Sequence, residues 1–146
     1  MVSKPSFVNQ PVIDWEPANT AVRAAIEQAV SMGIRVNASV VDPGGLQVAF
    51  LRMPGAPLHS MDIATDKAYT AAGFGLPTGM WHEVLKAHSV AVQEGVPLRP
   101  RFTAFGGGLP IMSEGRLIGG IGVSGGTEDE DVLCAKAGLK AIGLDE

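Results

Sequence analysis

Residues 116–126 read RLIGGIGVSGG, and TEDEDVLCAKAGLKAI follows at 127–142. The first stretch is apolar, rich in glycine and preceded by a glycine-containing turn, which predicts a strand. In the second stretch Thr127 and Glu130 have the spacing of a capping box, which predicts the start of a helix. Glycine has no side chain, so neighbouring backbone can approach it closely. We therefore expect a strand that leads directly into a helix and packs tightly in a compact core.

The same stretch also matches two functional motifs. Gly120–Gly125 fits the G-x-G-x-x-G pattern of dinucleotide sites, and Gly122–Gly126 fits the G-x-S-x-G pattern of a nucleophilic serine. A dinucleotide site needs a second parallel strand after the helix, which is not predicted, and the acids at 128–131 would repel a pyrophosphate. A catalytic serine in this motif needs a later histidine, and the last histidine is His88. We therefore interpret these glycines as packing residues.

The remaining chain divides into elements by its hydrophobic period. Helical spacing predicts four helices, at about 22–33, 60–72, 78–88 and 127–142. Strand-like patterns predict five strands, at about 36–40, 46–50, 102–105, 109–113 and 116–124. This order predicts an α+β fold with a five-stranded antiparallel sheet flanked by helices. We expect residues 1–17 to form an irregular N-terminal arm and residues 18–146 to form a single domain.

The composition indicates a compact domain without a basic surface. Of its 146 residues 46% are hydrophobic and 5% aromatic, and the formal net charge is −4. This acidic balance predicts no binding to nucleic acid, and no apolar run is long enough to predict a membrane span. The lone Cys134 rules out an internal disulfide, and the N-terminal residues lack the apolar segment of a signal peptide. We therefore expect a cytoplasmic protein.

Several side chains are candidates for a functional site. His59 precedes a predicted helix in a loop rich in proline and glycine, close in sequence to Arg52 and Asp62. It is either an axial ligand or acid/base group, or an ordinary surface histidine. Arg99 and Arg101 flank a proline, where they either hold a carboxylate or form a solvated pair. The aromatic residues available to line a pocket are Phe74, Trp81, Phe102 and Phe105.

Several stretches together resemble one known family. They are VDPGG at 41–45 leading to Arg52, ATDKAYTA at 64–71, FGGGLPI at 105–111, and GGIGVSGG at 119–126 leading to Asp131. These blocks resemble the GlcG/HbpS-like haem-binding or haem-degrading domains, which also occur as the C-terminal domain of some corrinoid adenosyltransferases. The resemblance covers roughly residues 18–143. It implies a profilin-like sandwich, with a five-stranded sheet between helices, that assembles into homo-oligomers.

Three functions remain open at this point. The resemblance favours a small-ligand binding protein, with haem or another tetrapyrrole as ligand, His59 as axial ligand and Arg101 as propionate partner. The residues expected to surround that ligand are Phe74, Trp81, Phe105 and Gly107. The alternative is a cytosolic catabolic enzyme, a hydrolase or isomerase acting on a small organic acid or aromatic breakdown product. Its general base would be His59 or Asp62, and its carboxylate clamp Arg52 or Arg101. The third is a structural, oligomeric accessory protein.

Overall fold

The fold is built on one antiparallel sheet. The computed structural model describes residues 3–145. The strands are β1 (Asn37–Val41), β2 (Gln47–Arg52), β3 (Gly108–Ser113) and β4 (Arg116–Ser124). Their order in the sheet is β2-β1-β4-β3, and every neighbouring pair is antiparallel. The predicted α+β class with a helix-flanked antiparallel sheet is confirmed, whereas the prediction of five strands is wrong, because the sheet has four.

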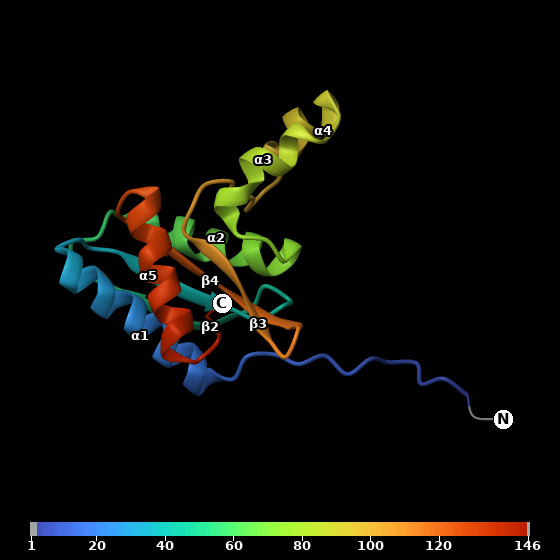
Figure 1. The fold of residues 1–146 in the computed structure, drawn as a ribbon, viewed down its shortest axis with the longest axis horizontal. Helices are drawn as coiled ribbons and strands as arrows, with labels where there is room; N and C mark the ends of the chain where they lie inside the picture. The colour runs from blue at the N-terminus through green and yellow to red at the C-terminus, as the bar shows by residue number, and fades with distance from the viewer. Residues whose placement is uncertain (1–2, 146) are drawn as a thin grey trace.

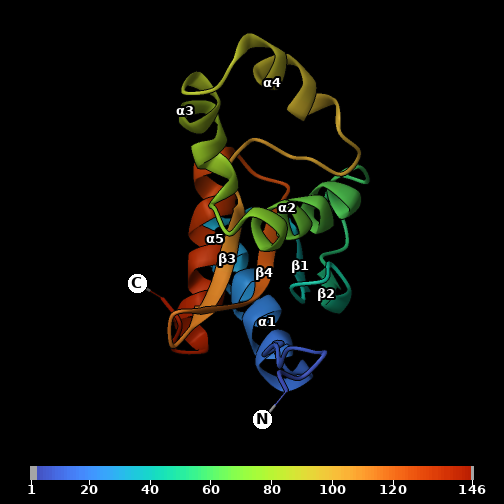
Figure 2. The same cartoon turned by 90° about the vertical axis from the view of Figure 1, so that its right-hand side faces the viewer.

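Helices cover both faces of this sheet. They are α1 (Trp15–Met32), α2 (Ser60–Phe74), α3 (Trp81–Lys86), α4 (Val90–Gly95) and α5 (Glu128–Ala141), with the short 3-10 helices η1 (Thr78–Met80) and η2 (Val96–Leu98). α1 and α5 pack together on one face, and α2 lies across the other (Figure 1). α3 and α4 project beyond the body (Figure 2). Within residues 3–145, none of the helices has both the length and the apolar character needed to cross a bilayer.

Local sequence signals at the β3–β4 hairpin and at α5 are confirmed. Glu114 and Gly115 have φ of 53° and 75°, as the tight turn between two antiparallel strands requires. At the start of α5 the Thr127 hydroxyl accepts from the Glu130 N–H (3.2 Å), and the Glu130 carboxylate accepts from the Thr127 N–H (2.9 Å). The capping box therefore begins the helix immediately after the strand.

Residues 102–105 do not form the predicted fifth strand. Backbone donors of this connection bind elsewhere: the Phe102 N–H donates to the Arg99 carbonyl oxygen (3.3 Å), the Thr103 N–H to Thr70 Oγ1 (3.0 Å), and the Gly106 N–H to the Glu128 carboxylate (2.7 Å). A strand would need these donors for its neighbour in the sheet. The segment therefore connects η2 to β3 without joining the sheet.

The glycines of β4 allow α2 to lie directly on the sheet. A Cβ placed on Gly120 would overlap the carbonyl oxygen of Ala68, and one placed on Gly122 would overlap the carbonyl oxygen of Ala64. Beside them Val41 of β1 packs with the small side chains of α2, including Ala68 and Ala72. The interpretation of these glycines as packing residues is therefore confirmed.

The N-terminal segment leaves the body just before α1. The Ile13 N–H donates to the carbonyl oxygen of Ile118 in β4 (2.9 Å), and the Ile13 side chain is buried. α1 then begins at Trp15, whose N–H donates to Asp14 Oδ1 (2.7 Å), so it starts within the expected arm. Residues 3–12 have no helix or strand; the Asn9 carbonyl oxygen accepts from the Arg116 guanidinium of β4 (3.1 Å), and the N-terminal end of the segment extends away from the body (Figure 1). Residues 1–2 of the predicted arm lie outside the described residues.

We expect Cys134 in α5 to lower the stability of the fold at alkaline pH. Burial raises the pKa of this thiol from 9.0 to about 11, and the carboxylates of Asp131 and Glu130 add to the shift. Between these values the folded chain keeps a proton that the unfolded chain has lost, so folding weakens as the pH rises. We expect the free energy of unfolding, measured by urea denaturation, to fall more steeply from about pH 8 to pH 10 in the wild type than in Cys134→Ala. Parallel pH profiles would contradict this expectation.

Candidate ligand-binding site

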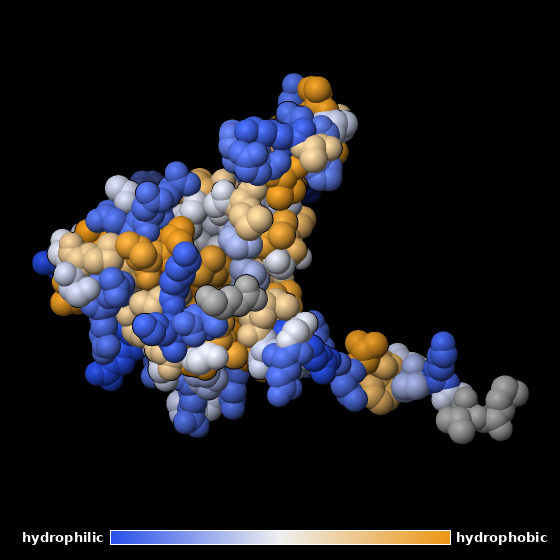
Figure 3. All heavy atoms as spheres, in the orientation of Figure 1, coloured by the Kyte–Doolittle hydropathy of each residue, from blue (hydrophilic) through white to orange (hydrophobic). Residues whose placement is uncertain are grey.

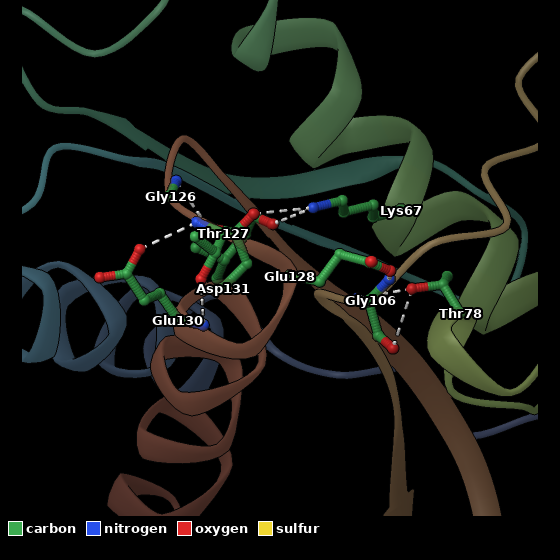
Figure 4. A network of polar contacts seen from close by, with 10 residues as sticks. Lys67, Thr78, Gly106, Gly126, Thr127, Glu128, Glu130 and Asp131 are labelled. Atoms are coloured by element: carbon green, nitrogen blue, oxygen red, sulfur yellow. Dashed lines mark hydrogen bonds and ion pairs between the residues drawn. The ribbon is translucent and has the colours of Figure 1, made fainter.

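A buried ion pair joins α2 to α5. Lys67 Nζ lies 3.0 Å from Asp131 Oδ2, and the two side chains are 1% and 4% exposed. The same Nζ donates to the Val123 carbonyl oxygen (2.8 Å) and lies 5.1 Å from the centre of the Phe105 ring. Asp131 Oδ1 accepts from the Gly126 N–H (2.9 Å). Figure 4 shows Lys67 reaching from α2 towards Asp131. The pair therefore fastens both helices to the end of β4.

Burial is the main influence on the ionisation of this pair. It lowers the pKa of Lys67 and raises the pKa of Asp131, and the opposite charge of the partner counteracts each shift. A single buried charge would cost much more than the paired charges, so we take the two groups to be ionised together. We interpret the pair as a structural support for the segment of Phe105 and Gly107, which lies against Lys67.

The glycine segment before β3 is held by side chains from two elements. The Gly106 N–H donates to Glu128 Oε1 (2.7 Å) at the start of α5. The Gly108 N–H donates to Thr78 Oγ1 (2.9 Å) of η1. Figure 4 shows Glu128 and Thr78 on either side of the glycine backbone. These contacts fix the end of the connection that carries Phe102 and Phe105.

Gly107, predicted as a ligand-binding residue, is buried in this segment. Its φ is 128°, and a Cβ placed there would lie 2.6 Å from Lys67 Nζ and 2.5 Å from the Val123 carbonyl oxygen. This position therefore requires glycine for its backbone conformation and for the space that Lys67 occupies. Phe105, also predicted, is 44% exposed and lies against Lys67.

Three of the aromatic residues noted in the sequence form one cluster. The ring centres of Phe74 and Trp81 are 4.6 Å apart, and those of Trp81 and Phe102 are 4.9 Å apart, both with edge-to-face geometry. Phe74 and Phe102 are 6.0 Å apart. Trp81 is buried whereas Phe74 is 56% exposed. The cluster therefore fixes the end of α2 and presents one aromatic face to solvent.

Arg101 is held beside this cluster in an unusual conformation. Its φ is 64°, which is uncommon for a residue with a side chain and stores strain. Thr70 Oγ1 donates to its carbonyl oxygen (3.0 Å), and its Nε donates to Asp66 Oδ1 (3.0 Å). Its guanidinium carbon lies 3.7 Å from the centre of the Tyr69 ring. α2 therefore holds Arg101 at its backbone through Thr70 and at its guanidinium through Asp66 and Tyr69.

These groups surround a pocket of about 340 Å³ between α2 and the connection after η2. Its lining residues are Tyr69, Thr70, Gly73, Phe74, Val96, Arg99, Pro100, Arg101 and Phe102. The structure therefore brings the predicted Arg101 and Phe74 together in one pocket. Trp81 does not line the pocket but packs against Phe74 and Phe102. The sequence reasoning missed Tyr69, whose ring lies between the Arg101 guanidinium and Gly45 of the β1–β2 turn. No local signal in the sequence links these three residues.

The other predicted site residues lie elsewhere. His59, Asp62 and Arg52 are exposed, and they share no ion pair within residues 3–145. His59 precedes the first turn of α2, whereas Tyr69 is the first α2 residue that lines the pocket. These positions differ by ten residues, which is about 15 Å along a helix. Within one chain the histidine and the pocket are therefore separate.

The fold and the pocket define a helix-flanked α+β domain with a pocket lined by aromatic and arginine side chains. The chain belongs to the family of HbpS-like haem-degrading proteins, whose family model matches residues 13–140.

Individual relatives agree with this assignment. The chain is 34% identical to the corrinoid adenosyltransferase PduO of Salmonella typhimurium over 132 residues, which cover 90% of this chain and 39% of PduO. It therefore spans well under half of that enzyme. It is 38% identical to an uncharacterized 15.0 kDa protein from the dhaT-dhaS intergenic region of Citrobacter freundii, covering 84% of this chain and 86% of that protein. A crystal structure of PduOC in complex with haem superposes with a TM-score of 0.82 at 31% identity, covering 92% of this chain and 99% of that one.

Proposed function

We propose that this protein binds a flat, largely apolar small molecule that carries carboxylates, with haem or another tetrapyrrole as the candidate. The observation that carries the proposal is the pocket beside α2, where Phe74 and Phe102 stand next to Arg99 and Arg101. Aromatic rings suit the face of such a ligand, and guanidinium groups suit its carboxylates. The haem complex of PduOC, a related structure, supports the same class of ligand.

The size of the pocket predicts how such a ligand would lie. Its volume of about 340 Å³ is at the lower end for small-ligand sites. A tetrapyrrole would therefore insert one edge against Phe74 and Phe102 and leave the rest outside this chain. Bound haem supplies an iron that needs an axial ligand. His59, the sequence-based candidate, is about 15 Å along α2 from the pocket, so it would reach that iron from a second copy of the chain.

A second copy is also favoured by exposed apolar residues on the projecting segments. Phe7 and Val8 of the N-terminal segment are 69% and 86% exposed, and Val90 of α4 and Leu98 of η2 are 66% and 82% exposed. Figure 3 shows hydrophobic atoms on both segments. Exposed apolar surface of this kind is typical of subunit contacts. We therefore include self-association in the proposed function.

The proposal predicts that haem and its metal-free form both bind, and that both lose affinity when Arg101 is replaced. We expect hemin and protoporphyrin IX to bind saturably, and Arg101→Gly to weaken both about tenfold because one charge-assisted contact is lost. Glycine accepts the positive φ of this position, so the variant keeps the backbone. Arg23→Ala, an exposed arginine on α1, is the matched control. Absorbance and fluorescence titrations with sedimentation equilibrium would measure binding and subunit number.

The outcomes of these titrations separate the parts of the proposal. If His59 is the axial ligand, His59→Ala changes the Soret spectrum with hemin and leaves protoporphyrin IX binding unchanged. Absence of saturable binding of either compound, or equal losses in Arg101→Gly and Arg23→Ala, would overturn the proposal.

The catabolic-enzyme alternative has less support. It requires His59 or Asp62 to act near Arg52 or Arg101, and the first three are exposed side chains that share no ion pair within residues 3–145. The cytoplasmic location remains a prediction, supported by the lone Cys134.

A further inference from the structure

A second and larger concavity shares no lining residue with the aromatic pocket. This cleft, of about 780 Å³, runs between α5 and β3. Its apolar lining comes from both elements and from the segments after α2 and α5, and includes Pro77, Leu109, Met112, Leu133, Leu139 and Leu144. Figure 3 shows hydrophobic atoms at the surface alongside the hydrophilic atoms of α5. A volume of this size is typical of small-ligand sites.

The cleft carries positive charge on a chain that is acidic overall. Lys136 and Lys140 of α5 both line it, and residues four apart on a helix lie on the same side. Neither lysine forms an ion pair with another residue of the described chain. Asp145, beyond the end of α5, is the acidic residue of the lining. The two ammonium groups therefore provide a site for one anionic group beside an apolar floor.

The shape of the cleft favours an elongated ligand. Its α5 residues extend from Leu133 to Lys140, seven positions or about 10 Å along the helix. β3 is an edge strand of the sheet, and an edge strand can pair with a further strand through its free backbone groups. Pro110 in the middle of β3 has no N–H to donate and lines the cleft. This arrangement disfavours strand addition and leaves the cleft to a ligand bound through side chains.

We propose that this cleft binds an amphipathic molecule with an elongated apolar chain and one anionic head group, held by Lys136 and Lys140. The apolar chain lies over Leu133 and Leu109. A carboxylate, as in a fatty acid, and a phosphate monoester share this chemistry. The site is separate from the aromatic pocket and does not depend on the tetrapyrrole proposal.

Calorimetric titration with dodecanoate, dodecyl phosphate and dodecanol tests the proposal. We expect saturable binding of at least one of the two anions and binding of dodecanol at least tenfold weaker. Which anion binds more tightly identifies the source of the head group. Chemical-shift changes in an amide NMR spectrum should centre on residues 109–112 and 133–145.

Variants identify the residues responsible. We expect Lys136→Ala/Lys140→Ala to weaken anion binding at least tenfold and to leave dodecanol binding unchanged, and Leu133→Asp to weaken all three ligands. Leu133 is 51% exposed, so this change leaves the fold intact. The matched controls are Lys86→Ala on α3 and Leu58→Asp, whose side chain is 72% exposed.

Three results would overturn the proposal. The first is the absence of saturable binding of both anions up to about 1 mM. The second is binding whose shift changes lie outside the cleft, for instance at Phe74 and Arg101. The third is a sedimentation equilibrium in which Leu133→Asp separates subunits, because the cleft would then be covered by a second copy of the chain.

Discussion

Replacing Asp131 by alanine is expected to lower the free energy of unfolding by about 3–5 kcal/mol. The change leaves the buried Lys67 ammonium, whose side chain is 1% exposed, without its ion-pair partner, and it removes the acceptor of the Gly126 N–H. The remaining acceptor of Lys67 is the Val123 carbonyl oxygen, which carries no full charge. Urea denaturation followed by circular dichroism measures the loss. A decrease below about 1 kcal/mol, the size of a surface pair, would contradict the structural role.

A double variant separates the charge from the packing. In Lys67→Met/Asp131→Leu both buried charges are replaced by apolar side chains of similar length. Such replacements are often neutral or stabilising, so we expect the double variant to recover most of the stability lost in Asp131→Ala. The exposed pair of Arg23 and Glu27 is the comparison, and Glu27→Ala should cost about 0.5 kcal/mol or less.

Gly122→Ala is expected to destabilise the fold by about 3 kcal/mol or more, although it adds one methyl group. The new Cβ would overlap the carbonyl oxygen of Ala64 and lie 2.5 Å from the backbone nitrogen of Ala68. Both are main-chain atoms, so no side-chain rotation can relieve the overlap and α2 must move away from β4. The midpoint of urea unfolding measures the effect.

Gly73→Ala is the matched control for this substitution. Gly73 lies in α2, and a Cβ placed there meets no atom within 4 Å. Alanine is favoured over glycine within a helix by about 1 kcal/mol, so this variant should be as stable as the wild type or more stable. Equal stability of Gly122→Ala and Gly73→Ala would show that the glycines of β4 are not needed for the approach of α2.

Local signals in the sequence predicted most of the elements. The capping box of Thr127 and Glu130 and the turn at Glu114 and Gly115 depend on neighbours in the chain, and the structure has both. The failure at residues 102–105 has a different cause. Their apolar character suggested a strand, but the Thr103 N–H donates to Thr70 and the following Gly106 N–H donates to Glu128, and both acceptors are distant in sequence.

The candidate pocket was predictable in part. Phe74 was identified as one of the few aromatic residues and Arg101 because Arg99 and Arg101 place two cations beside a predicted strand, and the structure places both residues in one pocket. Tyr69 was missed because its role comes from Gly45 and Arg101, which contact it from separate turns. Lys67 did carry a signal, since it shares a helix face with Ala64 and Ala71, and a lysine on such a face is often buried and paired.

By itself the sequence determined most of the elements and the family, because caps, turns, glycines and hydrophobic period act over a few residues. The tertiary structure alone decided which distant residues meet: Lys67 with Asp131, Tyr69 with Arg101, and α5 with the edge strand β3. These contacts depend on how α2 and α5 pack on the sheet. That depends on shape and burial summed over the whole chain, and no short stretch of sequence contains that information.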